Sequence, residues 1–343
     1  MTDQLRLISK PISNNLEQVT KVIREECNSV NSDYLHELLE YTFQVQGKLL
    51  RPMLVFSTAS IANNQPNQQA IWIAAGLEIL HTASLVHDDI IDGGTLRRGQ
   101  QTVHTKYGVN EATLLGDWLL AKSFELMTRT QNHKISHGMT LLTSELTEGQ
   151  FLEMEASSGK SYDESKYMKM IDLKTASIFR YACQFACLCT PGLEHLADRM
   201  LKFGTSFGIM FQIIDDLIDL YHQDETALKS TGLDILNGLT TLPIFRALDY
   251  EAKQTARPLT EALKSKDLSY IQNTLPSYLI SSGVFSECMT VAEEHAHSSL
   301  ELLDPKNSGT ELLRQLVQFT LNQVKKKVTS QVTLNTQDYD ASL

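Results

Sequence analysis

The chain has 343 residues, 42% of them hydrophobic and 21% charged, an ordinary balance for a soluble globular protein with a large core. Its net charge of −11 argues against nonspecific binding to nucleic acid or to an anionic membrane surface. Five cysteines in so long a chain do not suggest a disulfide framework, which indicates a reducing, cytoplasmic compartment. No signal-peptide pattern and no run of eighteen apolar residues is found, so we expect neither a leader nor a transmembrane segment.

Apolar residues recur at spacings of three and four along the whole chain, and no alternating strand pattern of useful length occurs. The sequence therefore predicts one all-α domain over residues 1–329, followed by a disordered tail over 330–343. The predicted helices cover residues 13–30, 34–46, 50–62, 68–92, 110–131, 136–156, 163–187, 193–221, 239–265, 267–283, 284–303 and 308–328.

The helix predicted over 68–92 ends in three carboxylates, those of Asp88, Asp89 and Asp92. On a helix, residues four apart lie on the same face, where like charges repel. A hard divalent cation removes this repulsion, and Mg²⁺ commonly combines one or two carboxylates with phosphate oxygens. Arg97 and Arg98 follow closely and offer guanidinium groups that match such phosphates.

The same acidic pattern returns near the end of the helix predicted over 193–221, at Asp215, Asp216 and Asp219. The residues around and between the acids are apolar in both copies, and carboxylates in apolar helices are rarely left without a partner. For a single copy, a solvent-exposed acidic helix face would be as good an explanation as a metal site. It does not account for two copies. We interpret the copies as two acidic walls of one cavity.

Six short motifs lie between about Gly47 and Pro243. They are Gly47-Lys48-Leu49-Leu50-Arg51-Pro52, the segment from His81 to Asp92, Arg97-Arg98-Gly99, Gly116-Asp117, Lys174-Thr175-Ala176, and Phe211-Gln212 leading into Asp215-Asp216-Leu217-Ile218-Asp219. In these motifs, and in their order, the chain resembles the trans-prenyltransferases, the all-trans isoprenyl diphosphate synthases. One such motif would mean little, whereas six at these spacings are specific.

The resemblance implies an all-α bundle with a central active-site cavity. The implied enzyme condenses isopentenyl diphosphate with an allylic diphosphate and uses three magnesium ions. The implied metal ligands are Asp88, Asp89, Asp92, Asp215, Asp216 and Asp219. The implied isopentenyl diphosphate site comprises Lys48, Arg51, His81 and Arg98, and the implied allylic site comprises Arg97, Lys174, Thr175, Gln212 and Lys229. Those expected to act in catalysis are Asp88, Asp92, Arg97, Lys174, Thr175, Gln212 and Asp215.

The chemistry agrees with this assignment, because negative charge builds on a departing diphosphate and metal ions with fixed cations stabilise it. The hydroxyl of Thr175 and the amide of Gln212 would stabilise the carbocation without capturing it. One departure concerns the loop after the second acidic motif, where Leu239 stands at a position that is usually basic in the family, although Lys229 and Asp234 are kept.

The product length is predicted from the helix before Asp88, along which the growing chain would run. One isoprene unit is about as long as a helix turn, about 5 Å. Ala83 and Ser84 are small where, in the family, a bulky aromatic residue stops growth at fifteen carbons, so a product of twenty carbons or more is expected. We favour about twenty-five to thirty-five carbons, with geranylgeranyl diphosphate as the alternative. The chain-length residues would be Ala83, Ser84, Leu80, Gly76 and Trp72.

Two other functions were weighed. A terpene cyclase would have no use for the second diphosphate site, and a noncatalytic subunit of a heteromeric synthase would commonly lose acids that this chain keeps. We further expect a homodimer, with the stretch from Leu114 to Leu126 as its surface, and transient membrane contact during product release. Cys183, Cys187 and Cys189 are expected to be apolar packing residues.

Overall fold

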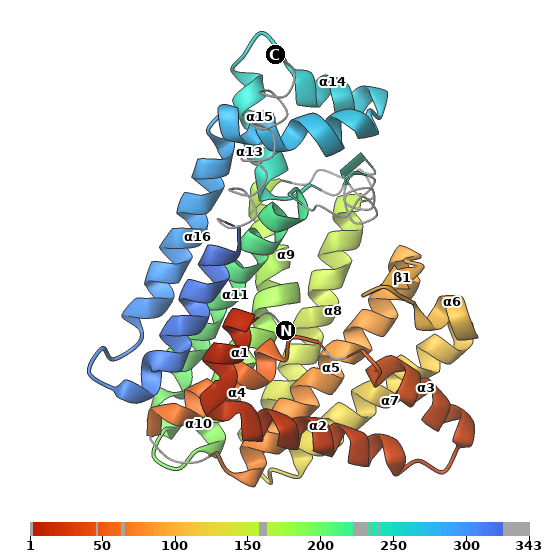
Figure 1. Cartoon of the computed structure of the whole chain (residues 1–343), viewed down its shortest axis with the longest axis vertical. Coiled ribbons are helices and arrows are strands. Elements are labelled where there is room, and N and C mark those ends of the chain that lie inside the picture. The colour runs from red at the N-terminus through yellow and green to blue at the C-terminus, as the bar shows by residue number, and fades with distance from the viewer. Residues whose placement is uncertain are drawn as a thin grey trace. The chain divides into compact units, whose positions relative to one another are not determined.

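The structure is a computed structural model that describes residues 3–45, 47–62, 66–157, 163–221, 232, 235–236, 238 and 240–324. Within these residues the chain is helical apart from one short hairpin, which confirms the predicted all-α class (Figure 1). Residues 229, 234, 239 and 330–343, which carried expectations about the loop and the tail, lie outside the described residues.

Contacts divide the chain into two compact units. The first unit comprises Met1–Leu142, Ile178–Leu201 and Asp304–Leu313, and the second comprises Thr143–Ser177, Lys202–Leu303 and Arg314–Leu343. The single domain expected over residues 1–329 stays a prediction.

The elements of the amino-terminal half are mostly helices. They are α1 (Asp3–Ser9), η1 (Lys10–Ile12), α2 (Ser13–Asn28), α3 (Asp33–Phe43), α4 (Leu50–Ala59), η2 (Ser60–Ala62), α5 (Gln68–Asp92), β1 (Leu96–Arg97), β2 (Gln100–Gln101), α6 (Val103–Tyr107), α7 (Val109–Thr128) and α8 (His133–Ser157). The predicted helices lie within a few residues of the observed ones, whereas α1, α6 and the hairpin were not predicted.

The carboxy-terminal half continues in the same way. Its elements are α9 (Glu164–Ile171), a π-helical turn η3 (Asp172–Ala176), α10 (Ser177–Cys189), η4 (Glu194–Leu196), α11 (Ala197–Asp219), α13 (Leu242–Ala252), α14 (Pro258–Ser265), η5 (Tyr270–Thr274), α15 (Leu275–Ser281), α16 (Val284–Glu301), η6 (Ser308–Thr310) and a helical stretch over 311–324.

Helix α5 is the centre of the first unit. Its start is capped by Asn67, whose side-chain oxygen accepts from the Ala70 backbone N–H at 2.9 Å. Its end is set by Gly93, whose φ of +65° is readily adopted by glycine. By length and composition α5 could cross a membrane, but 67% of its apolar window is buried inside the protein, as in a core helix.

Helices α5 and α7 pack antiparallel, and two glycines allow their close approach (Figure 1). A Cβ added to Gly76 would lie 2.9 Å from Met127 Cε, and one added to Gly116 would lie 2.2 Å from the His87 imidazole. The carboxy-terminal end of α5 is therefore fixed against the amino-terminal part of α7.

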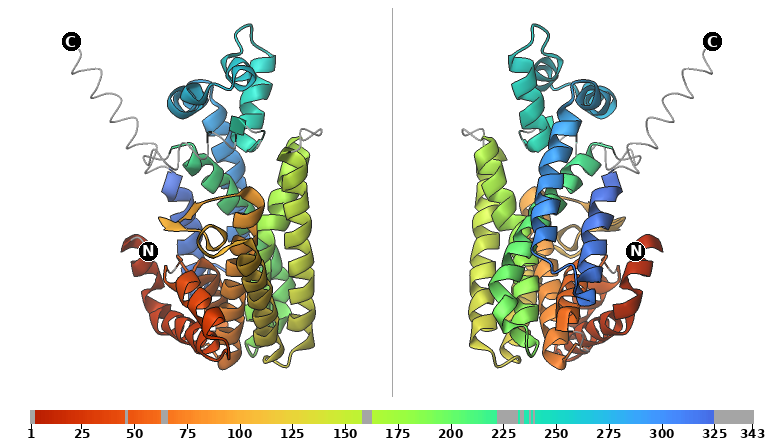
Figure 2. Two further views of the ribbon diagram at one scale, coloured as in Figure 1. Left: turned by 90° about the vertical axis from the view of Figure 1, so that its right-hand side faces the viewer. Right: turned by 90° about the vertical axis from the view of Figure 1, so that its left-hand side faces the viewer.

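In the second unit, helices α13 to α16 pack on one another (Figure 2). The helix predicted over 239–265 is wrong in one respect, because the chain breaks between α13 and α14. Pro258 begins α14, and the buried Glu251 carboxylate accepts from the backbone N–H groups of Leu259 and Thr260 at 2.6 and 2.9 Å. A carboxylate at a helix start satisfies donors that have no partner within that helix.

Candidate active site

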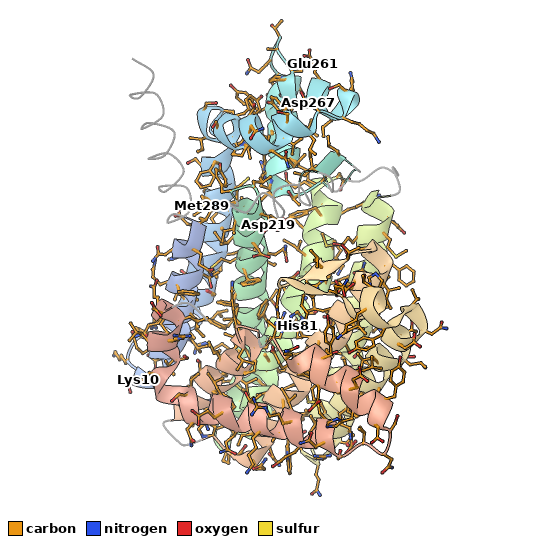
Figure 3. All side chains as sticks on the ribbon, turned by 45° about the vertical axis from the view of Figure 1, so that its right-hand side comes forward. Lys10, His81, Asp219, Glu261, Asp267 and Met289 are labelled. Carbon is orange, nitrogen blue, oxygen red and sulfur yellow. The ribbon has the colours of Figure 1, made fainter. Side chains whose placement is uncertain are left out.

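The predicted site residues fall into two groups, one in each compact unit. Figure 3 labels one member of each group, His81 on α5 and Asp219 on α11. The groups are described in turn.

The first acidic motif forms the last turn and a half of α5. Asp88 is half-buried and Asp92 is exposed, whereas Asp89 keeps only 8% of its surface accessible. Both carboxylate oxygens of Asp89 accept from Arg97 Nε at 2.9 Å, and Arg97 Nη2 lies 2.7 Å from Asp89 Oδ1. Such a charge-assisted pair fixes the direction of the guanidinium group. Asp89 therefore faces the protein, while the outer two acids are the more accessible ones.

A tight hairpin places the two neighbouring arginines. Arg97 pairs with Gln100 across β1 and β2, and Arg98 and Gly99 form the two-residue turn with φ of +53° and +76°. Positive φ at both central residues is the geometry that matches the twist of a hairpin. The two consecutive arginines therefore extend to different parts of the protein. Arg97 contacts Asp89, and Arg98 extends to the loop before α4.

A pocket of about 220 Å³ lies beside this motif in the first unit. It is lined by residues of α5, of the hairpin and of the loop at Gly47; among them are Glu78, His81, Thr82, Leu85, Asp89, Arg97 and Arg98. The structure thus brings together three of the predicted substrate residues, His81, Arg97 and Arg98. Arg51 is electrostatically coupled to Glu78 and Arg98, and Lys48 is exposed on the loop nearby.

Burial lowers the pKa of two groups at this pocket. It lowers the pKa of Arg51 to about 10, helped by Arg98 and opposed by Glu78. It also lowers the pKa of His81 well below its usual value, and the positive charges of Arg51, Arg98 and Arg97 act in the same direction. His81 is consequently a neutral imidazole that offers hydrogen bonds rather than charge.

The second acidic motif forms the end of α11, in the second unit. Asp215 and Asp219 are half-buried, whereas Asp216 keeps 9% of its surface accessible. Asp216 accepts from the Tyr167 hydroxyl at 2.6 Å and from Gln212 Nε2 at 2.7 Å. Burial raises the pKa of Asp216 from 3.8 to about 7, although both hydrogen bonds lower it. As in the first motif, the middle acid is the buried one and is held by protein donors.

A cavity of about 250 Å³ beside this motif brings together most of the candidates of the second unit, although Asp215 does not line it. It is lined by Glu153, Tyr167, Met170, Lys174, Thr175, Gln212, Asp216, Asp219, Leu220, Ile235 and Thr241. Thr175 Oγ1 donates to Gln212 Oε1 at 2.7 Å, which fixes the amide between Thr175 and Asp216. The Lys174 ammonium pairs with Glu153.

The π-helical turn η3 carries Lys174 and Thr175 to this cavity. Such turns insert one extra residue into an α-helix and are frequent at functional sites. A Cβ added to Gly149 of α8 would lie 2.5 Å from the Lys174 backbone nitrogen, so glycine lets α8 approach the turn. The continuous helix predicted over 163–187 did not anticipate this turn.

The predicted chain-length residues have separate surroundings. Leu80 and Ala83 are buried, Trp72 is half-buried, and Ser84 Oγ donates to the His81 carbonyl at 2.9 Å. The space beside Gly76 is occupied by Met127 of α7. Their part in setting the product length stays a prediction.

The donor set suits a hard divalent cation, because both motifs offer carboxylate oxygens. In the part of the chain that the structure describes, no three His, Cys, Asp or Glu residues form a cluster able to hold an ion by themselves. The outer acids therefore fit an ion whose other ligands come from outside the chain, as diphosphate oxygens would.

Three residues of these pockets were missed by sequence reasoning. Glu78 gave a usable signal, since it is the one carboxylate within the apolar run from Ala70 to Leu80. Glu153 lies in a helix with several other acids, and Tyr167 lies in an unremarkable helix, so neither was marked by its sequence context.

Comparison with known proteins identifies the family. The family model described as polyprenyl synthetase matches residues 32–275. A geranylgeranyl diphosphate synthase of Sulfolobus acidocaldarius is 30% identical over 302 residues, which cover 85% of this chain and 91% of the relative. An all-trans-nonaprenyl-diphosphate synthase (geranyl-diphosphate specific) of Rhodobacter capsulatus is 26% identical over 320 residues, which cover 93% of this chain and 98% of the relative.

A solved structure shows the same fold. A polyprenyl synthase from Caulobacter crescentus, complexed with calcium and isoprenyl diphosphate, superposes with a TM-score of 0.82 at 26% identity, over 94% of this chain and 97% of that chain. The family match also covers the six motifs from Gly47 to Pro243. The chain therefore belongs to the polyprenyl synthetase family of metal-dependent enzymes and is a prenyltransferase.

Proposed function

We propose that the protein condenses isopentenyl diphosphate with an allylic diphosphate to form an all-trans polyprenyl diphosphate of twenty carbons or more. The observation that carries the proposal is the common plan of the two acidic motifs. In each, the middle acid is buried and held by protein donors, and the outer acids are more accessible beside a pocket with fixed polar groups.

The outer acids Asp88, Asp92, Asp215 and Asp219 would hold the magnesium ions, three in the complete complex. When bound, the ions neutralise negative charge on the departing diphosphate. Asp89 and Asp216 belong to the same predicted set of metal ligands, and we propose that their bonds to protein donors let them position their neighbours. Arg97 donates to Asp89 through Nε and Nη2. Its Nη1 group is therefore the one that would contact the allylic diphosphate.

The pocket of about 220 Å³ beside α5 would take the diphosphate of isopentenyl diphosphate. Arg51, Arg98 and Lys48 supply positive charge, and the neutral His81 supplies a hydrogen bond. Guanidinium forks match phosphate oxygens in two-point contacts, which fix the substrate as well as bind it.

In the second unit, Lys174, Thr175 and Gln212 would line the allylic pocket, together with Lys229 from outside the described residues. Lys174 would neutralise charge on the leaving group. The Gln212 carbonyl oxygen and the Thr175 hydroxyl, fixed by their mutual hydrogen bond, would direct their dipoles at the carbocation. Fixed dipoles stabilise the cation at no cost of reorganisation, and no nucleophilic side chain is needed.

The product is proposed to have about twenty-five to thirty-five carbons, with geranylgeranyl diphosphate as the alternative. Support comes from the small residues Ala83 and Ser84 on α5. The relatives do not decide the length, since the names of two similarly related ones differ between geranylgeranyl and nonaprenyl products.

The active form is proposed to be a homodimer. On α7, Leu114 keeps 69% of its surface exposed and Val109 keeps 53%, and this apolar surface supports the proposal. Within the expected stretch, Leu115, Leu119 and Leu126 are buried in the protein itself. A cytoplasmic location is supported by five free, buried cysteines. Contact with a membrane would be transient and would serve product release.

A product assay tests the function. Purified protein would be incubated with Mg²⁺, labelled isopentenyl diphosphate and farnesyl diphosphate, and the dephosphorylated products would be separated by length. Elongation that ends at one length is expected. No incorporation with any allylic primer would contradict the proposal and favour a noncatalytic subunit of a heteromeric synthase. A cyclic product made without isopentenyl diphosphate would favour a terpene cyclase.

A further inference from the structure

Glu78 is a buried carboxylate in a pocket that is also lined by Asp89 and by the three arginines Arg24, Arg97 and Arg98. It lies on α5, keeps 8% of its surface accessible, and lines the same pocket as His81, Arg97 and Arg98. Its Oε2 atom is buried with no hydrogen-bond partner among the described residues. A buried carboxylate oxygen without a partner is costly, so the position requires an explanation.

Two guanidinium groups provide the electrostatic partners of Glu78. Burial raises the pKa of Glu78, and the positive charges of Arg51 and Arg98 act in the opposite direction without cancelling this rise. Arg51 also lies over the ring of Phe179, with its Cζ 5.4 Å from the ring centre. Arg51 therefore packs on an aromatic face and is close enough to Glu78 for that carboxylate to raise its pKa.

Arg98 and Glu78 both approach Gly47, in the loop before α4. A Cβ added to Gly47 would lie 3.1 and 3.2 Å from Arg98 Nη2 and Nη1, and 3.4 Å from Glu78 Oε1. Arg98 Nη1 also lies 3.5 Å from the Val45 carbonyl oxygen. The side chain thus reaches back from the exposed hairpin turn to a point where glycine leaves room for both charged groups.

We propose that Glu78 is a positioning residue of the pocket: its carboxylate holds the guanidinium groups of Arg51 and Arg98 in the places where they receive a diphosphate. The inference rests on the proposed function, because that diphosphate is assigned to isopentenyl diphosphate. Arg51 and Arg98 repel one another. Arg98 is less constrained than Arg51, because its backbone lies in an exposed turn. Without the carboxylate, the guanidinium group of Arg98 would move into solvent.

Removing Glu78 has two opposing electrostatic effects. It takes away a negative charge that repels the substrate, and it takes away the anchor of two cations that attract it. The second effect dominates if the pocket depends on orientation, because a bidentate guanidinium contact is lost when the group moves. Weaker binding of diphosphate after the carboxylate is removed therefore indicates that Glu78 positions the arginines. Tighter binding indicates that Glu78 only repels the substrate.

The test compares Glu78→Gln, Glu78→Asp and a matched control, Glu26→Gln. Glu26 has the same exposure of 8% and pairs with Arg129 and Lys122, but does not line the pocket. For Glu78→Gln we expect KM for isopentenyl diphosphate to rise about tenfold or more, with KM for the allylic primer within about twofold of wild type. Glu78→Asp should restore part of the loss, and Glu26→Gln should change neither KM.

A binding measurement keeps the inference separate from the proposed function. Titration of each full-length protein with inorganic diphosphate in EDTA, where the acidic motifs hold no metal, should show about tenfold weaker binding for Glu78→Gln. Equal or tighter binding by this variant would overturn the inference, whatever the enzyme makes. Wild-type protein that binds diphosphate in this way but incorporates no isopentenyl unit would instead overturn the proposed function.

Discussion

Arg97 donates to both carboxylate oxygens of Asp89, and this pair joins the hairpin to the last turn of α5. The pair separates two roles within one short acidic motif, because Asp89 is engaged by the protein while Asp88 and Asp92 are the more accessible acids. Replacing Asp89 and replacing an outer acid should therefore have different effects on activity and on the Mg²⁺ requirement.

Replacement of Asp89 by Asn should lower kcat/KM for the allylic substrate by about ten- to hundredfold, because the charge-assisted contacts to Arg97 are weakened. The concentration of Mg²⁺ needed for half-maximal activity should stay unchanged. A Mg²⁺ titration of wild type and variant checks this. A large increase in the required Mg²⁺ would show that Asp89 is a metal ligand after all.

Replacement of Asp88 by Ala should reduce turnover by orders of magnitude with little change in Tm. The side chain is half-buried, and its removal relieves repulsion from Asp92 one turn away. Single-turnover kinetics and thermal unfolding of the same preparation measure both quantities. Full activity of Asp88→Ala would refute the assignment of this acid to the metal.

Replacement of Ser84 by Phe should shorten the product, because the aromatic ring would fill the path of the growing chain one turn before Asp88. Ser84→Ala, which also removes the hydroxyl bond to the His81 carbonyl but adds no bulk, is the matched control. The products of both variants would be separated by length. An unchanged product from Ser84→Phe would show that the chain does not pass this face of α5.

Asp216 should make the metal-free protein less stable as the pH rises. Its pKa is raised from 3.8 to about 7 by burial, so between these values the folded state binds the proton that the unfolded state has released. Its contribution to stability is complete below pH 4, and is lost as the pH rises through about 7. In EDTA, Tm of the wild type should fall over this range relative to that of Asp216→Asn. Parallel pH curves for the two proteins would contradict the assignment.

The sequence predicted the positions of both acidic motifs because residues four apart share a helix face, and both lie at helix ends as expected. It did not distinguish the middle acids from the outer ones. Asp89 is buried because a hairpin brings Arg97 back to it, and that hairpin has no strong sequence signal, since its turn begins with an arginine at positive φ.

The partners of the second motif were hidden for a similar reason. Tyr167 reaches Asp216 from a helix that precedes it by 49 residues, and nothing in the local sequence marks that contact. The π-helical turn at Lys174 depends on one extra residue within a helical pattern, which periodicity alone does not detect. Motifs of fixed residue type and spacing could be identified from the sequence, whereas contacts between elements distant in the sequence could not.

One helix, α5, carries residues that we propose for both substrate sites. Glu78 and His81 lie in the middle of α5, and Asp88 and Asp92 lie at its end. At 1.5 Å per residue, His81 and Asp88 are about 10 Å apart along the axis. If each residue binds its proposed diphosphate, the rigid helix sets the distance between the electrophilic carbon of the allylic substrate and the double bond of isopentenyl diphosphate. Every round of elongation would then begin from the same separation, however long the hydrocarbon has become.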